Sequence, residues 1–310
     1  TAAYFDEGEH WAVPLYGMEQ VLWYRKDKFR EAGLEPPTTW SELVAAAQAL
    51  TGDGQYGIAV PAGRNLASDQ VIYSMMLTGG AGSLFDTQCD VTFDTPQTVA
   101  AFELYGELLA ASPPDATSFS WGEPQALFNA GTTAMAIEKG QYLTPWEEES
   151  GLPASELGMV RLPIADEGGQ EGTIYYSNAA MVLADEADAQ EAVEAFLAYL
   201  LEPNVYGRFL GAEPGLFFPL TQSGLESDTL WENPIVAKYR DYVEEMIAYS
   251  EYGALFGFTG GYVCDEIIAV SSQNLLAQVV QQMAGGMSAE EAVAWGQARM
   301  EEAVADFRTN

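Results

Sequence analysis

Residues 13–43, VPLYGMEQVLWYRKDKFREAGLEPPTTWSEL, hold the signals that decide the fold. The apolar and aromatic run at 21–24 predicts a buried strand, and residues 11–16 predict another strand that leads into a loop. Residues 26–32 predict a short helix. Gly33 ends it, because glycine readily adopts the left-handed conformation of a helix C-cap.

The same alternation continues along the rest of the chain. Thr39 or Ser41 can cap the next helix, whose apolar stripe runs to Leu50. We expect further strands at 56–61, 91–93, 133–137, 159–163 and 179–183, and further helices at 69–77, 97–111, 126–130, 189–201, 235–249, 265–283 and 288–307. Strands that alternate with helices, without a long series of hairpins, predict an α/β fold with sheets covered on both faces.

The charge of the chain excludes several classes of partner. Its 310 residues include 46 Asp and Glu against 12 Lys and Arg, a formal net charge of −34, while 48% are apolar. The apolar content is sufficient for a core, since disordered chains combine high charge with low hydrophobicity. A surface this acidic repels phosphate, so nucleic acid is not an expected partner and anionic lipid is disfavoured.

The acidic residues are dispersed over amphipathic segments, such as 185–191 and 147–149, and are not gathered in one tail. Such runs are mostly solvated helix faces. High salt screens their mutual repulsion beyond a few ångströms. We therefore take a halophilic source as a hypothesis.

The ends of the chain and its cysteines bear on location. No apolar run reaches the roughly 18 to 20 residues that span a bilayer. The start, TAAYFD, has neither the basic nor the apolar region of a signal peptide and no initiating Met, which indicates a processed or truncated product. Cys89 and Cys264 permit one disulfide in an exported protein, and their spacing matches no metal motif. Whether they are bridged stays open.

Motifs for catalysis are missing from the sequence. The single His, His10, flanks a strand without a nearby Ser or Cys partner, and no His/Cys cluster can hold zinc. Neither a phosphate-binding loop nor a dinucleotide-binding glycine pattern occurs. We therefore expect no enzyme activity, no catalytic residue, no metal and no cofactor.

Aromatic residues at predicted loops and strand ends indicate a binding function. They are Tyr16, Trp121, Tyr142, Trp146, Tyr175, Tyr176, Phe217, Phe218, Trp231, Phe256, Phe258 and Tyr262. Aromatic faces pack against the apolar C–H faces of sugars, while nearby Asp, Glu and Asn hydrogen-bond to hydroxyls. Each aromatic taken singly is more commonly a core residue, but their clustering beside turns favours a carbohydrate pocket.

Four stretches resemble one family, the extracellular solute-binding proteins of ABC importers, in the carbohydrate-binding cluster that includes maltose-binding protein. The stretch 13–43 carries the most specific resemblance. Residues 128–135, FNAGTTAM, are similar to the family's F-x-x-G-x-x-A-M strand entry, and 192–203 and 287–292 resemble two of its later helices. The resemblance covers nearly the whole chain. Family members begin with further βα units, however, roughly 90 residues that we expect to be missing here.

The resemblance implies a two-lobed, type II periplasmic-binding-protein-like α/β fold whose first lobe is incomplete in this chain. The implied limits are 1–14 and 177–230 for lobe 1, 15–176 and 231–310 for lobe 2, and hinge crossings near 14–16, 176–178 and 231–234. Ligand would bind in the cleft between the lobes, which close on it by hinge motion.

The resemblance also implies where ligand contacts lie. Trp121 falls where the family places an aromatic residue against the sugar. Tyr142, which follows Lys139 and Gly140, falls at the family's Gly-x-Trp aromatic. Six further candidates adjoin the expected hinges or face the expected cleft: Tyr16, Glu19, Asn65, Asp69, Tyr176 and Asn178.

Such a protein would be a non-catalytic receptor that binds a sugar or oligosaccharide and delivers it to the membrane permease of an ABC importer. We expect a monomer, extracellular or periplasmic, tethered through a lipid anchor upstream of the sequence. Two alternatives stay open. The same fold could hold a cationic solute, such as a polyamine or a thiamine-like compound, between carboxylates and aromatic faces, or a structural or adhesive surface protein could reuse the fold. A phosphorylated ligand is disfavoured because only Arg64 lies near the expected cleft loops.

Overall fold

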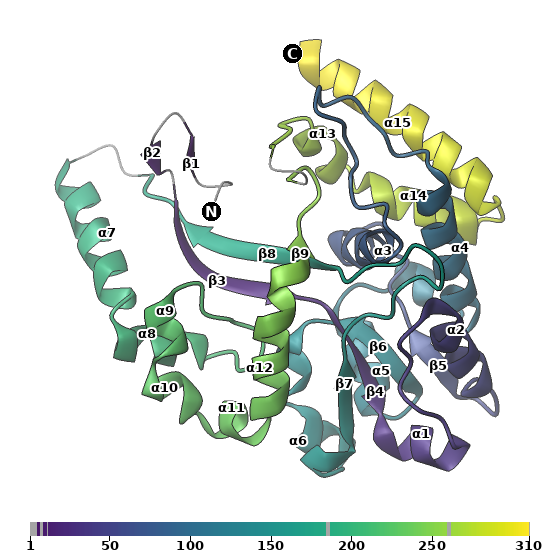
Figure 1. Ribbon diagram of the computed structural model, residues 1–310, viewed down its shortest axis with the longest axis horizontal. Coiled ribbons are helices and arrows are strands. Elements are labelled where there is room, and N and C mark those ends of the chain that lie inside the picture. The colour runs from purple at the N-terminus through teal and green to yellow at the C-terminus, as the bar shows by residue number, and fades with distance from the viewer. Residues whose placement is uncertain (1–4, 7–8, 11, 184–186, 259–261, 310) are drawn as a thin grey trace. The chain divides into compact units, whose positions relative to one another are not determined.

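The computed structural model of the chain describes residues 5–6, 9–10, 12–183, 187–258 and 262–309 (Figure 1). The chain forms two compact units. Unit 1 comprises residues 1–19, 139–145 and 175–251, and unit 2 comprises residues 20–138, 146–174 and 252–310.

Unit 2 is built on a four-stranded sheet. The strand order is β5 (Tyr56–Ala59), β6 (Thr133–Glu138), β4 (Val21–Arg25) and β7 (Leu157–Val160). β4 runs antiparallel to both of its neighbours, whereas β5 and β6 are parallel. Every residue of β4 and β6 is buried, which explains why these strands are mostly apolar and do not alternate between apolar and polar residues.

Helices pack against this sheet and against one another. They are α1 (Lys26–Ala32), α2 (Trp40–Ala49), α3 (Leu66–Thr78), α4 (Pro96–Ala110), α5 (Gly122–Asn129), α6 (Trp146–Ser150), α13 (Ile267–Ser271), α14 (Leu275–Ala284) and α15 (Ala289–Thr309). α3 packs against α4 and α14, and α15 packs against α4, α13 and α14 (Figure 1). Because α3 is enclosed in this way, every residue from Ala67 to Thr78 is buried, and the helix lacks the polar stripe of a surface helix. Within the described ranges, no helix combines the length and apolarity needed to cross a bilayer.

Local capping signals set where the first helices begin and end. Gly33 ends α1 with φ = 69°, the left-handed conformation predicted for it. Thr39 caps α2, because its hydroxyl accepts a hydrogen bond from the N–H of Glu42 while the Glu42 carboxylate accepts one from the N–H of Thr39. This reciprocal pair is a capping box. The cap predicted at Thr39 or Ser41 is therefore Thr39.

A disulfide joins the two cysteines within unit 2. Cys89 and Cys264 are 175 residues apart in the sequence, and their Cα atoms are 5.5 Å apart. Arg308, near the end of α15, donates a hydrogen bond to the backbone carbonyl of Cys89 and forms ion pairs with Asp90 and Glu266. The disulfide, which the sequence left open, is therefore formed, and Arg308 makes two ion pairs beside it.

Unit 1 is built around the antiparallel pair of β3 (Val13–Glu19) and β8 (Thr173–Ala180). The first two residues of β8 belong to unit 2, where they pair in parallel with β9 (Gly253–Ala254). On the other side of β3, Gly17 exchanges two backbone hydrogen bonds with Phe218. The remaining elements of unit 1 are β1 (Phe5–Asp6), β2 (Glu9–His10), α7 (Ala187–Leu200), α8 (Pro203–Leu210), α9 (Gln222–Leu225), α10 (Asp228–Trp231), α11 (Pro234–Lys238) and α12 (Arg240–Tyr249).

The strand predicted at 91–93 is reduced to a single antiparallel bridge between Val91 and Phe85, with the N–H of Thr92 donating to the carbonyl of Leu84. The side chain of Gln297 in α15 also bonds to this backbone. Its Oε1 accepts from the N–H groups of Phe93 and Asp94, and its Nε2 donates to the carbonyl of Val91. The segment has a β-like composition, but backbone pairing meets only part of its hydrogen-bonding requirement and a side chain meets much of the rest.

Three further predictions need smaller corrections. The strand predicted at 179–183 is the end of β8, which begins six residues earlier and stops at Ala180. The helix predicted at 235–249 is divided between α11 and α12 at Tyr239, whose φ of −109° and ψ of 30° are not helical. The helix predicted at 265–283 is divided before α14, where Asn274 takes a left-handed conformation with φ = 52°.

The predicted lobe limits stay a prediction. The two compact units change at 19/20, 174/175 and 251/252, and unit 1 also takes in residues 139–145. Residues 231–251 therefore belong to unit 1, whereas the sequence-based limits assign them to lobe 2.

Candidate functional site

The eight predicted ligand residues are divided between the two units. Unit 2 holds Asn65, Asp69 and Trp121, and unit 1 holds Tyr16, Glu19, Tyr142, Tyr176 and Asn178. In each unit some of these residues lie close to one another, whereas others contact residues outside the predicted set.

Trp121 is the most exposed of the predicted aromatics. It directly precedes α5, and 39% of the residue is accessible. Its indole Nε1 donates a hydrogen bond to Oε1 of Gln70, 3.4 Å away, and Gln70 is a buried residue of α3. This bond holds the indole against α3 while leaving apolar ring surface open, which is what stacking on a sugar requires.

Asn65 connects the start of α3 to the loop that leads to Trp121. Its Oδ1 caps the helix by accepting hydrogen bonds from the N–H groups of Ala67 and Ser68, and its Nδ2 donates to the carbonyl of Phe119 at 2.9 Å. The structure therefore brings Asn65 and the Trp121 loop together. In this arrangement the Asn65 amide already has protein partners on both its oxygen and its nitrogen.

Asp69 lies one turn further along α3 and is only 2% exposed. One carboxylate oxygen accepts from Nδ2 of Asn274 at 2.8 Å, and the other accepts from the backbone N–H of Ala277 at 2.6 Å. These groups form the start of α14, where backbone N–H groups have no partner within the helix. Asp69 therefore caps α14 from a position about 200 residues earlier in the chain.

Burial and these two hydrogen bonds shift the pKa of Asp69 in opposite directions. Burial raises the pKa from its ordinary 3.8 to about 6, and the hydrogen bonds from Asn274 and Ala277 reduce the rise. The direction follows because removing a carboxylate from water costs more than removing the neutral acid. Near neutral pH the group is mostly ionised, and its negative charge is favourably placed at a helix N-terminus.

Tyr16 belongs to an aromatic cluster in unit 1. Its ring stacks on Phe217 with centroids 3.8 Å apart and an angle of 26° between the planes. Phe209 completes the cluster, 5.9 Å from Tyr16 and 5.6 Å from Phe217. One β-strand, one helix and one loop each contribute a ring, so a residue predicted on local grounds joins two that are about 200 residues away in the sequence.

Tyr176 and Asn178 share one face of the β3–β8 pair with Tyr16. The register places Asn178 directly opposite Tyr16, and Tyr176 lies two residues earlier in β8, so the alternation of strand side chains directs it to the same side. Nδ2 of Asn178 is buried, and among the described residues no acceptor lies in range. A buried amide in this state costs free energy until a water or a ligand oxygen accepts its hydrogen bond.

Glu19 lies on the opposite face, at the end of β3. It is fully buried, and no donor within the described part of the chain reaches either of its carboxylate oxygens. Burial raises the pKa of Glu19 well above its ordinary value, because an uncompensated charge is far less stable in the interior than the neutral acid. Burial therefore shifts Glu19 toward its protonated form, which has one O–H to donate.

Tyr142 is in the buried turn Gly140–Tyr142 of unit 1 and is 0% exposed. The turn is closely packed: a Cβ at Gly140 would lie within 1.6 Å of the carbonyl oxygen of Gly215. The ring of Tyr142 therefore contributes to the core of unit 1 in this structure, and its predicted contact with ligand stays a prediction.

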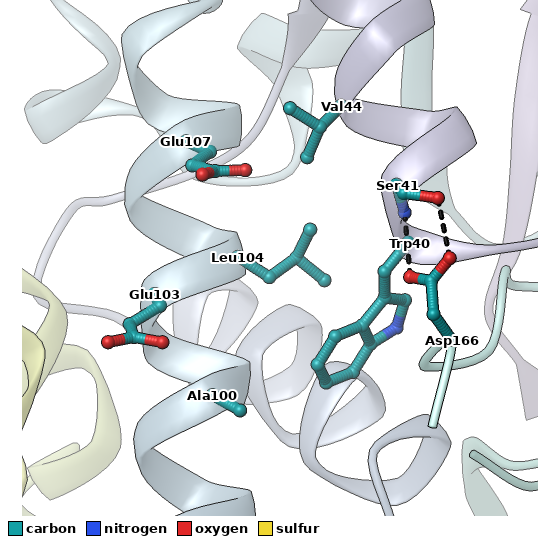
Figure 2. A pocket seen from close by; sticks show the side chains of 8 residues that line it. All are labelled: Trp40, Ser41, Val44, Ala100, Glu103, Leu104, Glu107 and Asp166. Carbon is teal, nitrogen blue, oxygen red and sulfur yellow. Dashed lines mark hydrogen bonds between the residues drawn. The ribbon is translucent and has the colours of Figure 1, made fainter. Parts of the chain in front are cut away.

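A pocket of about 280 Å³ lies entirely within unit 2, between α2 and α4 (Figure 2). It is lined by Trp40, Ser41, Val44, Ala100, Glu103, Leu104, Glu107 and Asp166. Asp166 accepts hydrogen bonds from the N–H and Oγ of Ser41, the latter at 2.5 Å, and these bonds lower its pKa. None of the predicted ligand residues lines this pocket, so it is separate from the candidate site.

Sequence reasoning missed the partners of the candidate residues. Gln70 supports Trp121 from 51 residues earlier in the chain, and Phe209 and Phe217 support Tyr16. Phe217 is an aromatic residue beside a predicted turn, but no local pattern in the sequence connects it with Tyr16. Such pairings depend on long-range packing, and a single sequence carries no signal for them.

Comparisons with known proteins give the family. The family model of the bacterial extracellular solute-binding proteins matches residues 1–206, more than half of the chain. The chain belongs to this family. Its members are binding proteins and not enzymes, which confirms the predicted absence of catalysis, and they act outside the cytoplasm, in agreement with the predicted extracellular or periplasmic location.

Two relatives show how far the likeness extends. YcjN of Escherichia coli K12, named as an ABC transporter periplasmic-binding protein, is 24% identical over 91% of this chain and 64% of its own length. The mannitol-binding protein of Pseudomonas aeruginosa is 24% identical over 68% of this chain and 49% of its own length. The chain thus spans less than two thirds of the length of either relative.

Solved structures in this family confirm the fold class. The solute-binding protein of Agrobacterium radiobacter K84 in complex with ribitol superposes with a TM-score of 0.77 at 23% identity, covering 96% of this chain and 72% of its own. Maltose-bound MalE3 of T. maritima superposes with a TM-score of 0.79 at 16% identity, covering 99% of this chain and 75% of its own. The predicted type II periplasmic-binding-protein-like fold is therefore confirmed.

Proposed function

We propose that the protein binds a sugar or oligosaccharide, leaves it chemically unchanged and delivers it to the membrane permease of an ABC importer. Family membership supports the binding role. The names of two relatives support the ligand class: the mannitol-binding protein and the arabinooligosaccharide-binding protein of Halalkalibacterium halodurans, which is 22% identical over 78% of this chain. Their ligands share one chemistry, hydroxyl groups on an apolar C–H frame.

The exposed indole of Trp121, held in place by Gln70, is the observation that carries the proposal. A large aromatic residue exposed to 39% on an acidic protein loses hydrophobic stabilisation unless something covers it. A sugar covers it well, because its C–H face is apolar while its hydroxyls stay hydrogen-bonded to neighbouring polar groups.

The proposed binding mode follows the family resemblance. Within unit 2 the proposed ligand contact is Trp121, and within unit 1 the proposed contacts are Tyr16, Tyr176 and Asn178. The unsatisfied Nδ2 of Asn178 supports this role, since a ligand hydroxyl could accept its hydrogen bond. Asp69 and Asn65 then act indirectly, because their side chains hold α14 and the Trp121 loop in position.

Isothermal titration against a panel of sugars, polyols and oligosaccharides tests the proposal. One or more of these should bind, and Trp121→Ala should weaken that binding by more than about tenfold, which corresponds to about 1.4 kcal/mol. Phe307→Ala is the matched control, because Phe307 is 38% exposed in the same unit and should leave affinity unchanged. An unchanged affinity in Trp121→Ala would remove Trp121 from the site.

Spermidine in the same titration distinguishes the cationic alternative. Binding of spermidine that weakens steeply with added salt, with no heat from any carbohydrate, would favour a cationic ligand held by carboxylates. No heat from any ligand would favour a structural or adhesive role. We also propose that the receptor is monomeric and tethered to the membrane by a lipid anchor outside these 310 residues.

A further inference from the structure

A second pocket, of about 290 Å³, lies within unit 1 where three helix ends meet. α10 packs against α8 and against α11 (Figure 1). The pocket is lined by Arg208 and Gly211 at the end of α8, Thr229 and Glu232 at α10, and Asn233 at the start of α11. None of the eight predicted ligand residues lines it, so this pocket is separate from the candidate site.

Hydrogen bonds and close packing hold the walls of the pocket in place. Asn233 caps α11 with its Oδ1, and its Nδ2 donates to the carbonyl of Gly211 at 3.0 Å. The hydroxyl of Thr229 donates to the carbonyl of Asn204 at 3.1 Å. A Cβ at Gly207 would lie 2.2 Å from Oγ1 of Thr229, so α8 and α10 are in close contact here. The pocket is therefore preformed, which reduces the free energy spent on ordering it around a ligand.

Arg208 differs from the other arginines of this acidic chain. Each of the others forms an ion pair or donates a hydrogen bond to an acceptor of the protein. The guanidinium of Arg208 is exposed and has no such partner within the described ranges. Because the chain carries 46 acidic residues, an arginine without a carboxylate partner is unexpected. Its N–H donors are therefore available to a group from outside the protein.

Glu232 provides the opposite charge in the same pocket. Its carboxylate has no hydrogen bond or ion pair among the described residues, and in particular it forms none with Arg208. A guanidinium binds a carboxylate through two parallel hydrogen bonds, and a carboxylate binds an ammonium group through charge-assisted hydrogen bonds. Two opposite charges that line one pocket without pairing to each other therefore fit a ligand that carries both charges.

We propose that this pocket binds a small zwitterion of the amino-acid type, whose carboxylate pairs with Arg208 and whose ammonium group pairs with Glu232. The net charge of −34 repels a simple anion, and a simple cation leaves Arg208 without a partner. A zwitterion has no net charge, so the field of the protein does not oppose its binding. The volume of about 290 Å³ is at the lower end for ligand pockets and limits the ligand to a small molecule.

NMR titration of the protein with glycine, β-alanine and γ-aminobutyrate tests this proposal. The three amino acids place the carboxylate and the ammonium group at increasing separations, so their relative affinities report the spacing of the two charges in the pocket. At least one should give saturable shifts of the backbone amides of Gly211, Thr229 and Asn233. Because both charged side chains are exposed, we expect a weak dissociation constant, of about 1 to 10 mM.

Two substitutions test the roles of the charged side chains. Arg208→Gln and Glu232→Gln should each weaken the binding by more than about tenfold, because each leaves one charge of the ligand without a partner. Arg30→Gln is the matched control, because Arg30 is an exposed arginine of unit 2 that already pairs with Glu156. This control changes the net charge as Arg208→Gln does, and it should leave the affinity unchanged.

Three results would overturn the proposal. The first is the absence of saturable shifts with all three amino acids up to about 50 mM. The second is binding of acetate or methylammonium as tightly as the best amino acid, which would show that a single charge is sufficient. The third is an affinity that stays unchanged in both Arg208→Gln and Glu232→Gln, with the remaining amide shifts showing that both variants are folded.

Discussion

Replacing Asp69 with asparagine tests whether the burial of this carboxylate makes the stability of the protein depend on pH. The group has an ordinary pKa of 3.8 and a pKa of about 6 in the folded protein. Each pKa unit corresponds to about 1.36 kcal/mol, so the difference amounts to about 3 kcal/mol of pH-dependent stability. Because Asn does not titrate, the comparison with Asp69→Asn isolates this contribution from the other carboxylates.

The sign follows from the direction of the shift. The folded state binds the proton of Asp69 more tightly than the unfolded state does, so this contribution to stability is fully present below about pH 3.8 and is lost as pH rises through about 6. The free energy of unfolding of the native protein, relative to Asp69→Asn, should therefore fall by about 3 kcal/mol between pH 3.5 and pH 7.

Urea unfolding at constant high salt, followed at several pH values, measures this difference. Asp166→Asn is a control of opposite sign, since the hydrogen bonds of Ser41 lower the pKa of the exposed Asp166 and its contribution is lost as pH falls. A difference between the native protein and Asp69→Asn that does not change over this pH range would refute the reasoning, because it would mean that Asp69 is not desolvated in the folded state.

Three further predictions concern stability. Replacing Cys89 and Cys264 together with serine should lower the free energy of unfolding by about 5 kcal/mol, since the disulfide closes a loop of 175 residues. Denaturant unfolding measures this loss, and a loss below about 1 kcal/mol would contradict the loop-closure argument. Thr39→Ala should cost about 1 kcal/mol through loss of the capping box, as measured by the same unfolding curves, while Ser118→Ala, a change in a surface turn, should cost less. The acidic surface predicts a melting temperature that rises with salt; no loss of stability below about 0.5 M salt would contradict the halophilic hypothesis.

Much of unit 2 could be predicted because its signals are local. The run at 21–24 is buried on both sides and so is continuously apolar, Gly33 ends α1 because its φ is positive, and Thr39 caps α2 three residues before Glu42. Capping, backbone conformation and strand burial depend on residues within a few positions of one another. These elements therefore appear at nearly the predicted boundaries.

The errors fall where a distant group decides the outcome. At 91–93 the side chain of Gln297 bonds to the backbone beside a single β-bridge, and at Asn274 the helix start is built around Asp69 from α3. Neither arrangement leaves a pattern in its own neighbourhood. The side chain that satisfies the backbone is about 200 residues away in both cases.

In the candidate site, too, local signals predict some residues, whereas distant segments supply their partners. Aromatic residues beside turns and the family resemblance were enough to select Trp121 and Tyr16. The partners that hold them, Gln70 for Trp121 and Phe217 for Tyr16, come from distant segments. The family resemblance predicts Asp69 as a ligand residue, and the structure shows both of its oxygens hydrogen-bonded at the start of α14.

The sequence by itself determined the fold class, the family and the strong negative charge, because these depend on composition and on patterns repeated along the chain. The tertiary structure decided the disulfide between Cys89 and Cys264, the burial of Glu19 and Tyr142, and the pocket that Arg208 and Glu232 line together. Each of these depends on which distant surfaces meet when the chain packs. Packing is a property of the whole fold, and no local stretch of sequence encodes it.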